Sequence, residues 1–269
     1  MTYLSRIWLN PLRRQSQKLL SSPERLHAAV LGGISRQPIS ERVLWRLESD
    51  SSRGEAHDRP RREYRAELLV LTESAPSWEH LIEQAGWAHA DEPQALIRDY
   101  QPLLDRLETG REFRFRLRAN PVSSTRTPMN PSVSQKERLS QPRPRGVRVP
   151  HRTATHQIAW LTSRVERWGF HVLDTPDGDP ALRLTARDRL TFYKRGEGEP
   201  GAGAGAGAGA SSTRGHRVVL STATFDGALR VTDPALARHT LTHGVGSAKA
   251  YGCGLLTLAA YRPPAETGG

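Results

Sequence analysis

The chain has 269 residues, which is long enough for one large domain or two small ones. Its 39 Lys and Arg residues outnumber its 28 Asp and Glu residues, giving a net charge of +11, and nearly all of the positive charge is arginine. Arginine favours bidentate contact with phosphate, so a polyanionic partner such as nucleic acid is expected. A GC-rich genome would explain the preference for arginine over lysine, but not the net excess of positive charge.

Several classes of protein have no support. The single cysteine, Cys253, excludes a disulfide framework and a thiolate metal site, and the ten histidines lack zinc spacing. No G-x-S-x-G elbow suggests a serine hydrolase. The N-terminus has no signal-peptide pattern, and no apolar window approaches the length of a membrane span. We therefore expect a cytoplasmic protein with no cofactor, no metal and no membrane partner.

The first half of the chain alternates strand and helix signals. Aromatic and β-branched residues predict a strand over residues 3–10, and Ser22 followed by Pro23 begins a helix that continues to Ile34. The elements expected next are strands at 43–48 and 67–72 with a charged segment at 49–62 between them, a helix at 76–84, and a loop at 86–110 with a helical turn near 103–107.

Residues 111–119, REFRFRLRA, give the clearest strand signal in the chain. Phenylalanine and leucine alternate strictly with arginine, which predicts one face in a core and a row of guanidinium groups on the other. With this strand the order becomes β-α-β-β-α-β, the ferredoxin-like arrangement. We accordingly predict an α+β protein whose first domain covers residues 1–119.

The remaining residues, 120–269, are expected to form a second, irregular ferredoxin-like domain. It begins with a long basic loop at 121–146, and the low-complexity run GAGAGAGAGA is expected to form a flexible hairpin tip at 196–213. The expected elements are strands at 147–149, 170–173, 183–195, 218–225 and 229–231, the last two joined by a tight turn at Asp226-Gly227, helices from Thr153 to Trp168 and from Asp233 to about Leu241, and a disordered tail at 262–269.

A glycine-rich segment, GVGSAKAYGCGLLTLAAY, closes this half at residues 244–261. Four glycines surround Lys249 and precede an apolar run that predicts a buried strand. Backbone N–H groups in such a turn can bind an anion, but the segment can equally be a turn that lets a strand enter the core. The spacing matches neither a P-loop nor a dinucleotide fingerprint.

His27 is the most suggestive titratable residue, because it follows the first strand in the early turns of a helix. An imidazole can act as general acid or base near neutral pH. A lone histidine on a helix is more often structural or simply exposed, so position alone does not decide its role.

Resemblance to a known family adds to this interpretation. The segments YLSRIWLN, SSPERLH, FRFRLRANP, VRVP, HQIAWL and GVGSAKAYGCGLLTLA follow one another as in the CasE family of CRISPR-associated endoribonucleases of the type I-E Cascade system. The resemblance covers nearly the whole chain and implies two tandem ferredoxin-like (RRM-like) domains. It also implies metal-independent cleavage of precursor crRNA at the base of the CRISPR repeat hairpin. The products would be a 2′,3′-cyclic phosphate and a 5′-hydroxyl, with the protein remaining bound as a Cascade subunit beside the other subunits.

The resemblance places the family's catalytic histidine on His27. Glu24 stands where the family often has a tyrosine, and either acts with His27 or favours the helix N-terminus. Ser35 matches a serine near the active site of some relatives, and Gly32 replaces a lysine found in some members. A cation that stabilises the transition state would then come from Lys249 or an arginine. An alternative function is a structural subunit that binds the RNA hairpin with little or no cleavage.

The family holds its RNA hairpin on a basic surface, because an A-form major groove is too narrow for base readout. In this sequence the resemblance suggests residues of the long loop, the strands beside the Gly-Ala run, and the glycine-rich segment. The candidate RNA-binding residues are Arg126, Lys136, Arg138, Arg143, Arg145, Lys194, Arg195, Arg214, Arg217, Gly244, Gly246 and Lys249.

Overall fold

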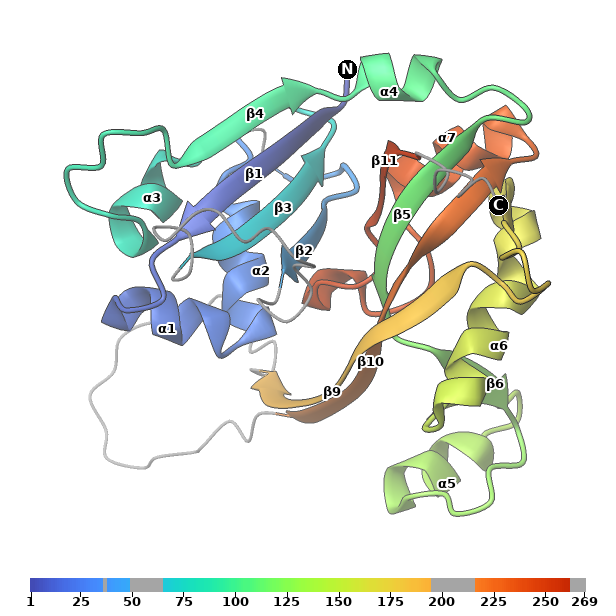
Figure 1. Ribbon diagram of the computed structural model, residues 1–269. Coiled ribbons are helices and arrows are strands. Elements are labelled where there is room, and N and C mark those ends of the chain that lie inside the picture. The colour runs from blue at the N-terminus through green and yellow to red at the C-terminus, as the bar shows by residue number, and fades with distance from the viewer. Residues whose placement is uncertain (36–37, 49–64, 195–215, 262–269) are drawn as a thin grey trace, which may run out of the picture.

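The computed structural model describes residues 1–35, 38–48, 65–194 and 216–261. Two antiparallel sheets lie side by side, one built from each half of the chain (Figure 1). The expectations for the charged segment 49–62, the Gly-Ala tip at 196–213 and the tail at 262–269 fall outside the described residues, as do Arg195 and Arg214.

The first sheet has the strand order β2-β3-β1-β4, which is the ferredoxin-like order. Helices α2 and α3 make the two connections, and a short helix that the sequence did not suggest, α1, precedes α2. The elements are β1 (Tyr3–Leu9), α1 (Arg14–Leu20), α2 (Pro23–Leu31), β2 (Leu44–Glu48), β3 (Ala66–Thr72), α3 (Glu79–Ala85) and β4 (Ala95–Asp99).

Strand β3 is buried on both faces. Leu68 and Val70 pack in the core beneath the helices, whereas Leu69 and Leu71 join the core of the second sheet. This explains why β3 reads as an unbroken apolar run rather than an alternating one. The second half of the chain therefore covers the face of the first sheet that the helices leave open (Figure 1).

The second sheet repeats the same topology in the order β11-β5-β10-β8, so the prediction of two tandem ferredoxin-like domains is confirmed. Strand β9 pairs with the first twelve residues of β10 and forms a long hairpin that extends away from the sheet (Figure 1). The elements are α4 (Gln101–Asp105), β5 (Glu112–Ala119), β6 (Val122–Thr125), α5 (Val133–Leu139), β7 (Val147–Pro150), α6 (Ala154–Val165), η2 (Glu166–Trp168), β8 (Phe170–Val172), β9 (Leu182–Lys194), β10 (His216–Val231), α7 (Pro234–His243), η3 (Lys249–Tyr251) and β11 (Leu256–Ala260).

One strand is in a different sheet from the one expected. The alternating strand β5 pairs with β10 and β11, so it begins the second ferredoxin-like unit instead of closing the first. The fourth strand of the first sheet, which we expected to be β5, is instead β4, and it pairs with β1. Strand β4 lies in the segment 86–110, which we predicted as loop. Leu96 and Ile97 of β4 are 36% and 40% exposed, so this edge strand lacks the alternating pattern that reveals a half-buried strand. A boundary after residue 119 would place β5 in the first domain, apart from its partners.

Strand β10 is continuous, so the turn predicted at Asp226-Gly227 is wrong. Asp226 pairs with Arg116 of β5 through two contacts of 2.6 and 3.1 Å. Gly227 lies where β9 comes close, and a Cβ there would collide with the carbonyl oxygen of Ala181. The lack of a side chain at Gly227 thus allows two backbone segments to approach closely, and the residue is not part of a turn.

The segment expected as a long loop at 121–146 contains β6 and α5. Helix α5 begins with a capping box in which Ser132 accepts from the backbone of Gln135 and the Gln135 side chain accepts from the backbone of Ser132. The S-x-x-Q spacing was therefore a readable helix signal. The two-stranded β6–β7 sheet and α5 extend from the body of the molecule (Figure 1).

A charged network joins the two sheets. Arg46 of β2 is 2% exposed and donates to the carbonyl oxygens of Arg116 and Leu255 at 3.0 and 2.8 Å. Its Nε donates to Glu48 at 2.7 Å, and the other oxygen of Glu48 pairs with Arg116 at 3.0 Å. Because a buried guanidinium needs partners for its N–H groups, these contacts fix the position of β2 against β5 and β11.

Candidate functional site

His27 lies on the second turn of α2 and is half-buried against Trp45 of β2. The indole N–H of Trp45 donates to Nδ1 of His27 at 3.2 Å. The two rings are nearly parallel, with their centroids 6.5 Å apart and their planes 21° from parallel. An indole nitrogen can only donate, so Nδ1 must present a lone pair.

Burial lowers the pKa of His27 below its ordinary value of 6.5. Protonation of Nδ1 would also make its N–H face the indole N–H of Trp45, and this repulsion further disfavours the charged ring. Among the described residues, only Trp45 hydrogen-bonds to His27, which leaves Nε2 available to a ligand. At neutral pH the ring is therefore uncharged.

The other two residues predicted at the catalytic site lie at opposite ends of α2. Glu24 is half-buried in the first turn, where a carboxylate suits the helix dipole, and the oxygen of Ser22 caps the same turn. Ser35 is exposed and lies beyond the end of α2. This helix ends at Leu31, whereas the sequence predicted that it continues to Ile34. Within the described chain His27 hydrogen-bonds to Trp45 and not to Glu24 or Ser35.

The glycine-rich segment from Gly244 to Gly254, here called the glycine loop, packs on β2 beside the His27 site. Gly252 lies against the ring of Trp45, and Gly244 lies against Leu44. Both have positive φ, at +76° and +69°. The single-turn helix η3 within the loop contacts α2 as well as β2, and Figure 1 shows it in red between the two sheets.

Backbone contacts close the glycine loop. The N–H of Val245 donates to Gly254 at 2.9 Å, and the N–H of Gly254 donates to Arg118 at 2.7 Å. Leu255 and Leu256, each 1% exposed, continue from the loop into the core. Gly246 differs from its neighbours, because it is exposed and a Cβ there would meet only Trp160, at 3.4 Å.

Lys249 caps a helix. Its Nζ donates to the carbonyl oxygen of His243, at the end of α7, at 2.7 Å. Burial lowers the pKa of Lys249, and the positive charge of Arg42 lowers it further. Arg42 is exposed and stands just before β2, so two cations lie near each other beside the site. Sequence reasoning missed Arg42, which carries no motif signal.

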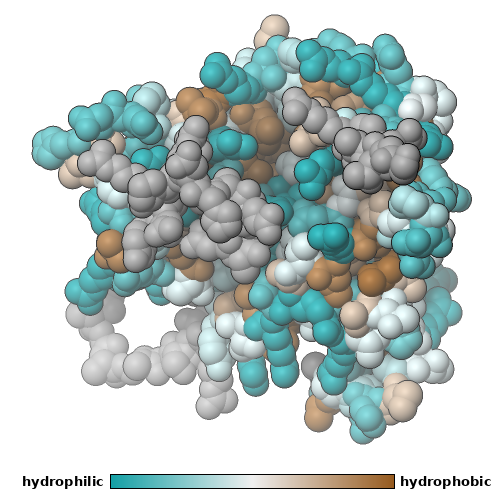
Figure 2. Space-filling model, in the orientation of Figure 1, coloured by the Kyte–Doolittle hydropathy of each residue, from teal (hydrophilic) through white to brown (hydrophobic). Residues whose placement is uncertain are grey.

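Six of the basic residues predicted for RNA binding are exposed, and they are spread over the second half: Arg126, Lys136, Arg138, Arg143, Arg145 and Arg217. Arg126 follows β6, Lys136 and Arg138 lie on α5, and Arg143 and Arg145 lie between α5 and β7. Arg217 is exposed on β10, and Lys194 ends β9. Figure 2 shows hydrophilic side chains, interspersed with paler and hydrophobic ones, on the part of the surface where the β9–β10 hairpin lies.

The predicted row of guanidinium groups on β5 is largely paired with carboxylates. Arg116 contacts Asp226 and Glu48, and Arg118 contacts Asp188 at 3.2 Å. Of the three arginines in this row, Arg114 is exposed and the other two are half-buried. The row therefore serves the packing of strands more than it serves an external ligand.

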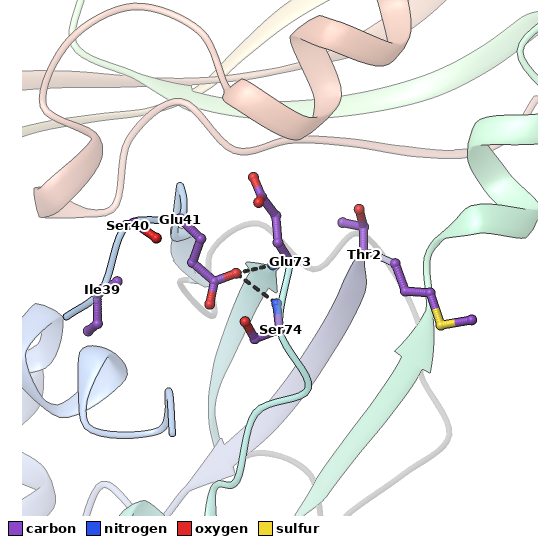
Figure 3. Close-up of a pocket in the computed structure, with 7 residues that line it drawn as sticks. Thr2, Ile39, Ser40, Glu41, Glu73 and Ser74 are labelled. Carbon is purple, nitrogen blue, oxygen red and sulfur yellow. Dashed lines mark hydrogen bonds between the residues drawn. The ribbon is translucent and has the colours of Figure 1, made fainter. Parts of the chain in front are cut away.

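A cavity of about 330 Å³ lies at the carboxyl end of β3, lined by residues that include Glu41 and Glu73. Figure 3 shows Glu41 turned toward the segment that follows β3. There its carboxylate accepts hydrogen bonds from the backbone N–H groups of Glu73 and Ser74 at 2.5 and 2.7 Å. Two carboxylates repel a phosphate, so this cavity does not suit RNA. Within the described ranges no three His, Cys, Asp or Glu side chains form a group that could hold a metal ion, and no helix could cross a membrane.

The structure has two ferredoxin-like sheets, and His27 lies where the glycine loop of the second half packs on the first sheet. Comparison with known proteins identifies the class of protein that this arrangement defines. A family model described as CRISPR associated protein matches residues 2–260. The chain is 30% identical over 260 residues to the CRISPR-associated endoribonuclease Cse3 of Thermus thermophilus, covering 96% of this chain and 99% of that protein.

Solved structures agree with this match. Thermus thermophilus Cse3 bound to an RNA representing a pre-cleavage complex has a TM-score of 0.65 and 28% identity, covering 96% of this chain and 99% of that one. Escherichia coli K-12 Cas6e has the same fold, with a TM-score of 0.50, 20% identity and 96% and 100% coverage. The chain belongs to the CRISPR-associated protein family, and its resemblance to CasE, another name for Cse3, is confirmed.

Proposed function

We propose that this protein is an endoribonuclease that binds the hairpin of a CRISPR repeat RNA and cleaves precursor crRNA at the base of the stem. The observation that carries the proposal is the placement of His27 where α2, β2 and the glycine loop meet, with Nε2 free of protein partners among the described residues. The similarity to a protein named an endoribonuclease, over 96% of the chain, supports the same class of reaction.

The proposed chemistry is an internal transesterification. The 2′-oxygen of the scissile ribose forms a bond to phosphorus as the bond from phosphorus to the 5′-oxygen breaks. The 2′-hydroxyl loses a proton and the 5′-oxygen gains one, so the products are a 2′,3′-cyclic phosphate and a 5′-hydroxyl with no net change in protons. His27 assists this exchange as the acid-base group, and the reaction requires no metal.

RNA binding is assigned to two surfaces. At the glycine loop, backbone N–H groups near the exposed Gly246 contact phosphate, with Lys249 and Arg42 supplying positive charge. The exposed arginines around α5 and on the β9–β10 hairpin contact the stem through phosphates. After cleavage the protein stays on its product and serves as a subunit of the Cascade complex.

One experiment tests the reaction. The protein is incubated in EDTA with its own repeat hairpin, either unmodified or carrying a 2′-deoxy nucleotide at the scissile position. We expect cleavage of the unmodified RNA alone, and none by the His27→Ala variant. Cleavage of the 2′-deoxy hairpin, or undiminished cleavage by His27→Ala, contradicts the proposal.

The alternative is a structural subunit that binds the hairpin and cleaves it little or not at all. It is favoured by Glu24, which stands where the family often has a tyrosine, and by Gly32, which stands where some members have a lysine. Tight, salt-dependent binding with no product under single-turnover conditions would select this alternative. The EDTA experiment with native RNA therefore distinguishes the two functions.

A further inference from the structure

We propose that Trp45 is a positioning residue that holds His27 in the tautomer with its proton on Nε2, so that His27 meets the RNA as a hydrogen-bond donor. This inference rests on the proposed function and specifies how its central residue acts.

The position of Trp45 allows it only to donate a hydrogen bond to the imidazole ring of His27. Trp45 is 2% exposed, and its indole N–H has a single direction set by packing in the first core. That N–H lies 3.2 Å from Nδ1 of His27, and the two ring planes are only 21° from parallel, so the in-plane N–H points at the in-plane lone pair. A neutral imidazole has one N–H and one lone pair; with the lone pair on Nδ1, the proton is on Nε2.

The tautomer of His27 determines whether it can act in RNA cleavage as a general base or as a hydrogen-bond donor. A general base that takes the 2′-hydroxyl proton at Nε2 needs the opposite tautomer, with N–H on Nδ1 facing the indole N–H. A donor at Nε2 needs no change, and can stabilise negative charge developing on a phosphate oxygen or the 5′-oxygen. The bonds to phosphorus that form and break are those stated above, but in this mode water replaces His27 as the proton carrier: the 2′-hydroxyl proton passes to water, and water protonates the departing 5′-oxygen.

The charged and titratable groups on the elements packed around His27 do not provide another partner for Nδ1. These groups are Glu24 and Arg25 on α2 itself, Arg14 and Lys18 on α1, and Lys249 and Tyr251 on η3, and none of them hydrogen-bonds to His27 among the described residues. Arg46 of β2 is bound to Glu48 and to the second sheet. Lys249 donates to His243 instead. Within the described chain, Trp45 alone therefore sets the tautomer.

The protein offers a matched control for testing this role. Trp78 lies in the same core and is also 2% exposed, but its indole nitrogen is without a hydrogen-bond partner in the described structure. Trp45→Phe and Trp78→Phe therefore both remove a buried indole N–H while keeping an aromatic ring. Only Trp45→Phe removes a hydrogen bond to His27.

The first readout is the protonation of the two His27 nitrogens, measured by ¹⁵N NMR at neutral pH. We expect protonated Nε2 and unprotonated Nδ1 in the unmodified protein and in Trp78→Phe, and a mixture of tautomers in Trp45→Phe. Protonated Nδ1 in the unmodified protein overturns the inference without any variant. An unchanged tautomer in Trp45→Phe overturns it as well.

The second readout is single-turnover cleavage of the repeat hairpin. Trp45→Phe should cleave about tenfold more slowly with unchanged hairpin affinity, the effect of losing one hydrogen bond in the transition state. Equal losses in both variants would attribute the effect to core packing and overturn the inference. If His27→Ala cleaves normally, the proposed function fails, while the NMR result still reports whether Trp45 sets the tautomer.

Discussion

Gly252 lies so close to Trp45 that no side chain fits between them. A Cβ at this position would stand 2.7 Å from Cζ3 of the indole and 3.0 Å from its neighbour Cη2. The same indole donates to His27. The glycine loop of the second domain therefore supports, through one aromatic ring, the residue proposed to act on RNA in the first.

The contact between Gly252 and Trp45 predicts the effect of adding a methyl group. Gly252→Ala should displace Trp45 and also strain a backbone with φ of +76°, lowering the free energy of unfolding by about 2–4 kcal/mol. Thermal or denaturant unfolding measures this loss, and cleavage should fall more than hairpin binding does.

Gly246→Ala is the control for backbone strain. Its φ of +69° is similar, but its Cβ would have ordinary contact with Trp160, so we expect a loss of only about 1–2 kcal/mol. If Gly246 binds phosphate through its backbone, Gly246→Val should weaken RNA binding without changing cleavage of bound RNA. Equal destabilisation by the two alanine variants would show that Trp45 gives way without cost.

The pH dependence of stability should report the buried state of His27. Burial lowers its pKa in the folded protein below 6.5, so as pH falls through that value the unfolded chain takes up the proton first. Stability from this residue is therefore present above about pH 6.5 and lost as pH falls toward the folded pKa. His27→Gln removes this dependence.

The measurement compares unfolding free energies of the unmodified protein and His27→Gln between pH 5 and 8. The variant should gain stability relative to the unmodified protein as the pH falls. A difference that stays constant across this range would contradict a lowered pKa.

Much of the first sheet was predictable because local signals match its contacts. Ser22 and Pro23 begin α2 as expected, and β3 is the apolar run that two cores require. The catalytic role proposed for His27 rests on resemblance, since nothing in its immediate sequence distinguishes a catalytic from a structural histidine. Trp45 could not be found, because the hydrogen bond that gives it a role joins residues 18 positions apart.

The second half shows which errors arise from long-range contacts. Strand β5 has a clear alternating pattern, but a pattern does not say which sheet the strand joins. Asp226-Gly227 is a common turn pair, yet Arg116 binds the carboxylate and neighbouring backbone excludes a side chain at the glycine. Helix α5 is a different case, since its capping box is local and can be read from Ser132 and Gln135 alone.

Arg46 should be the most costly charge to remove from the contact between the sheets. Arg46→Ala leaves Glu48 and two carbonyl oxygens without their buried donor, so we expect a loss of about 3–5 kcal/mol in unfolding free energy. Arg6→Ala, which removes the exposed partner of the half-buried Glu67, should cost at most about 1 kcal/mol. Similar losses in the two variants would show that Arg46 does not hold the sheets together.

The basic residues around α5 should govern the salt dependence of RNA binding. Arg138, Arg143 and Arg145 are exposed and form no ion pair within the described ranges, so their charges are available to phosphates. Replacing all three by glutamine should weaken hairpin binding and reduce the slope of log affinity against log salt by about one for each phosphate that an arginine no longer neutralises.

Arg230→Gln provides the matched control, because Arg230 is comparably exposed but its guanidinium already pairs with Glu112 at 2.8 Å. Its removal should leave the salt slope unchanged. Binding titrations of the repeat hairpin at several salt concentrations measure both slopes, and single-turnover rates at saturating protein should match the unmodified protein, since none of these residues touches His27. A triple variant with an unchanged slope would show that the RNA stem lies elsewhere, leaving the β9–β10 hairpin as the basic surface that holds it.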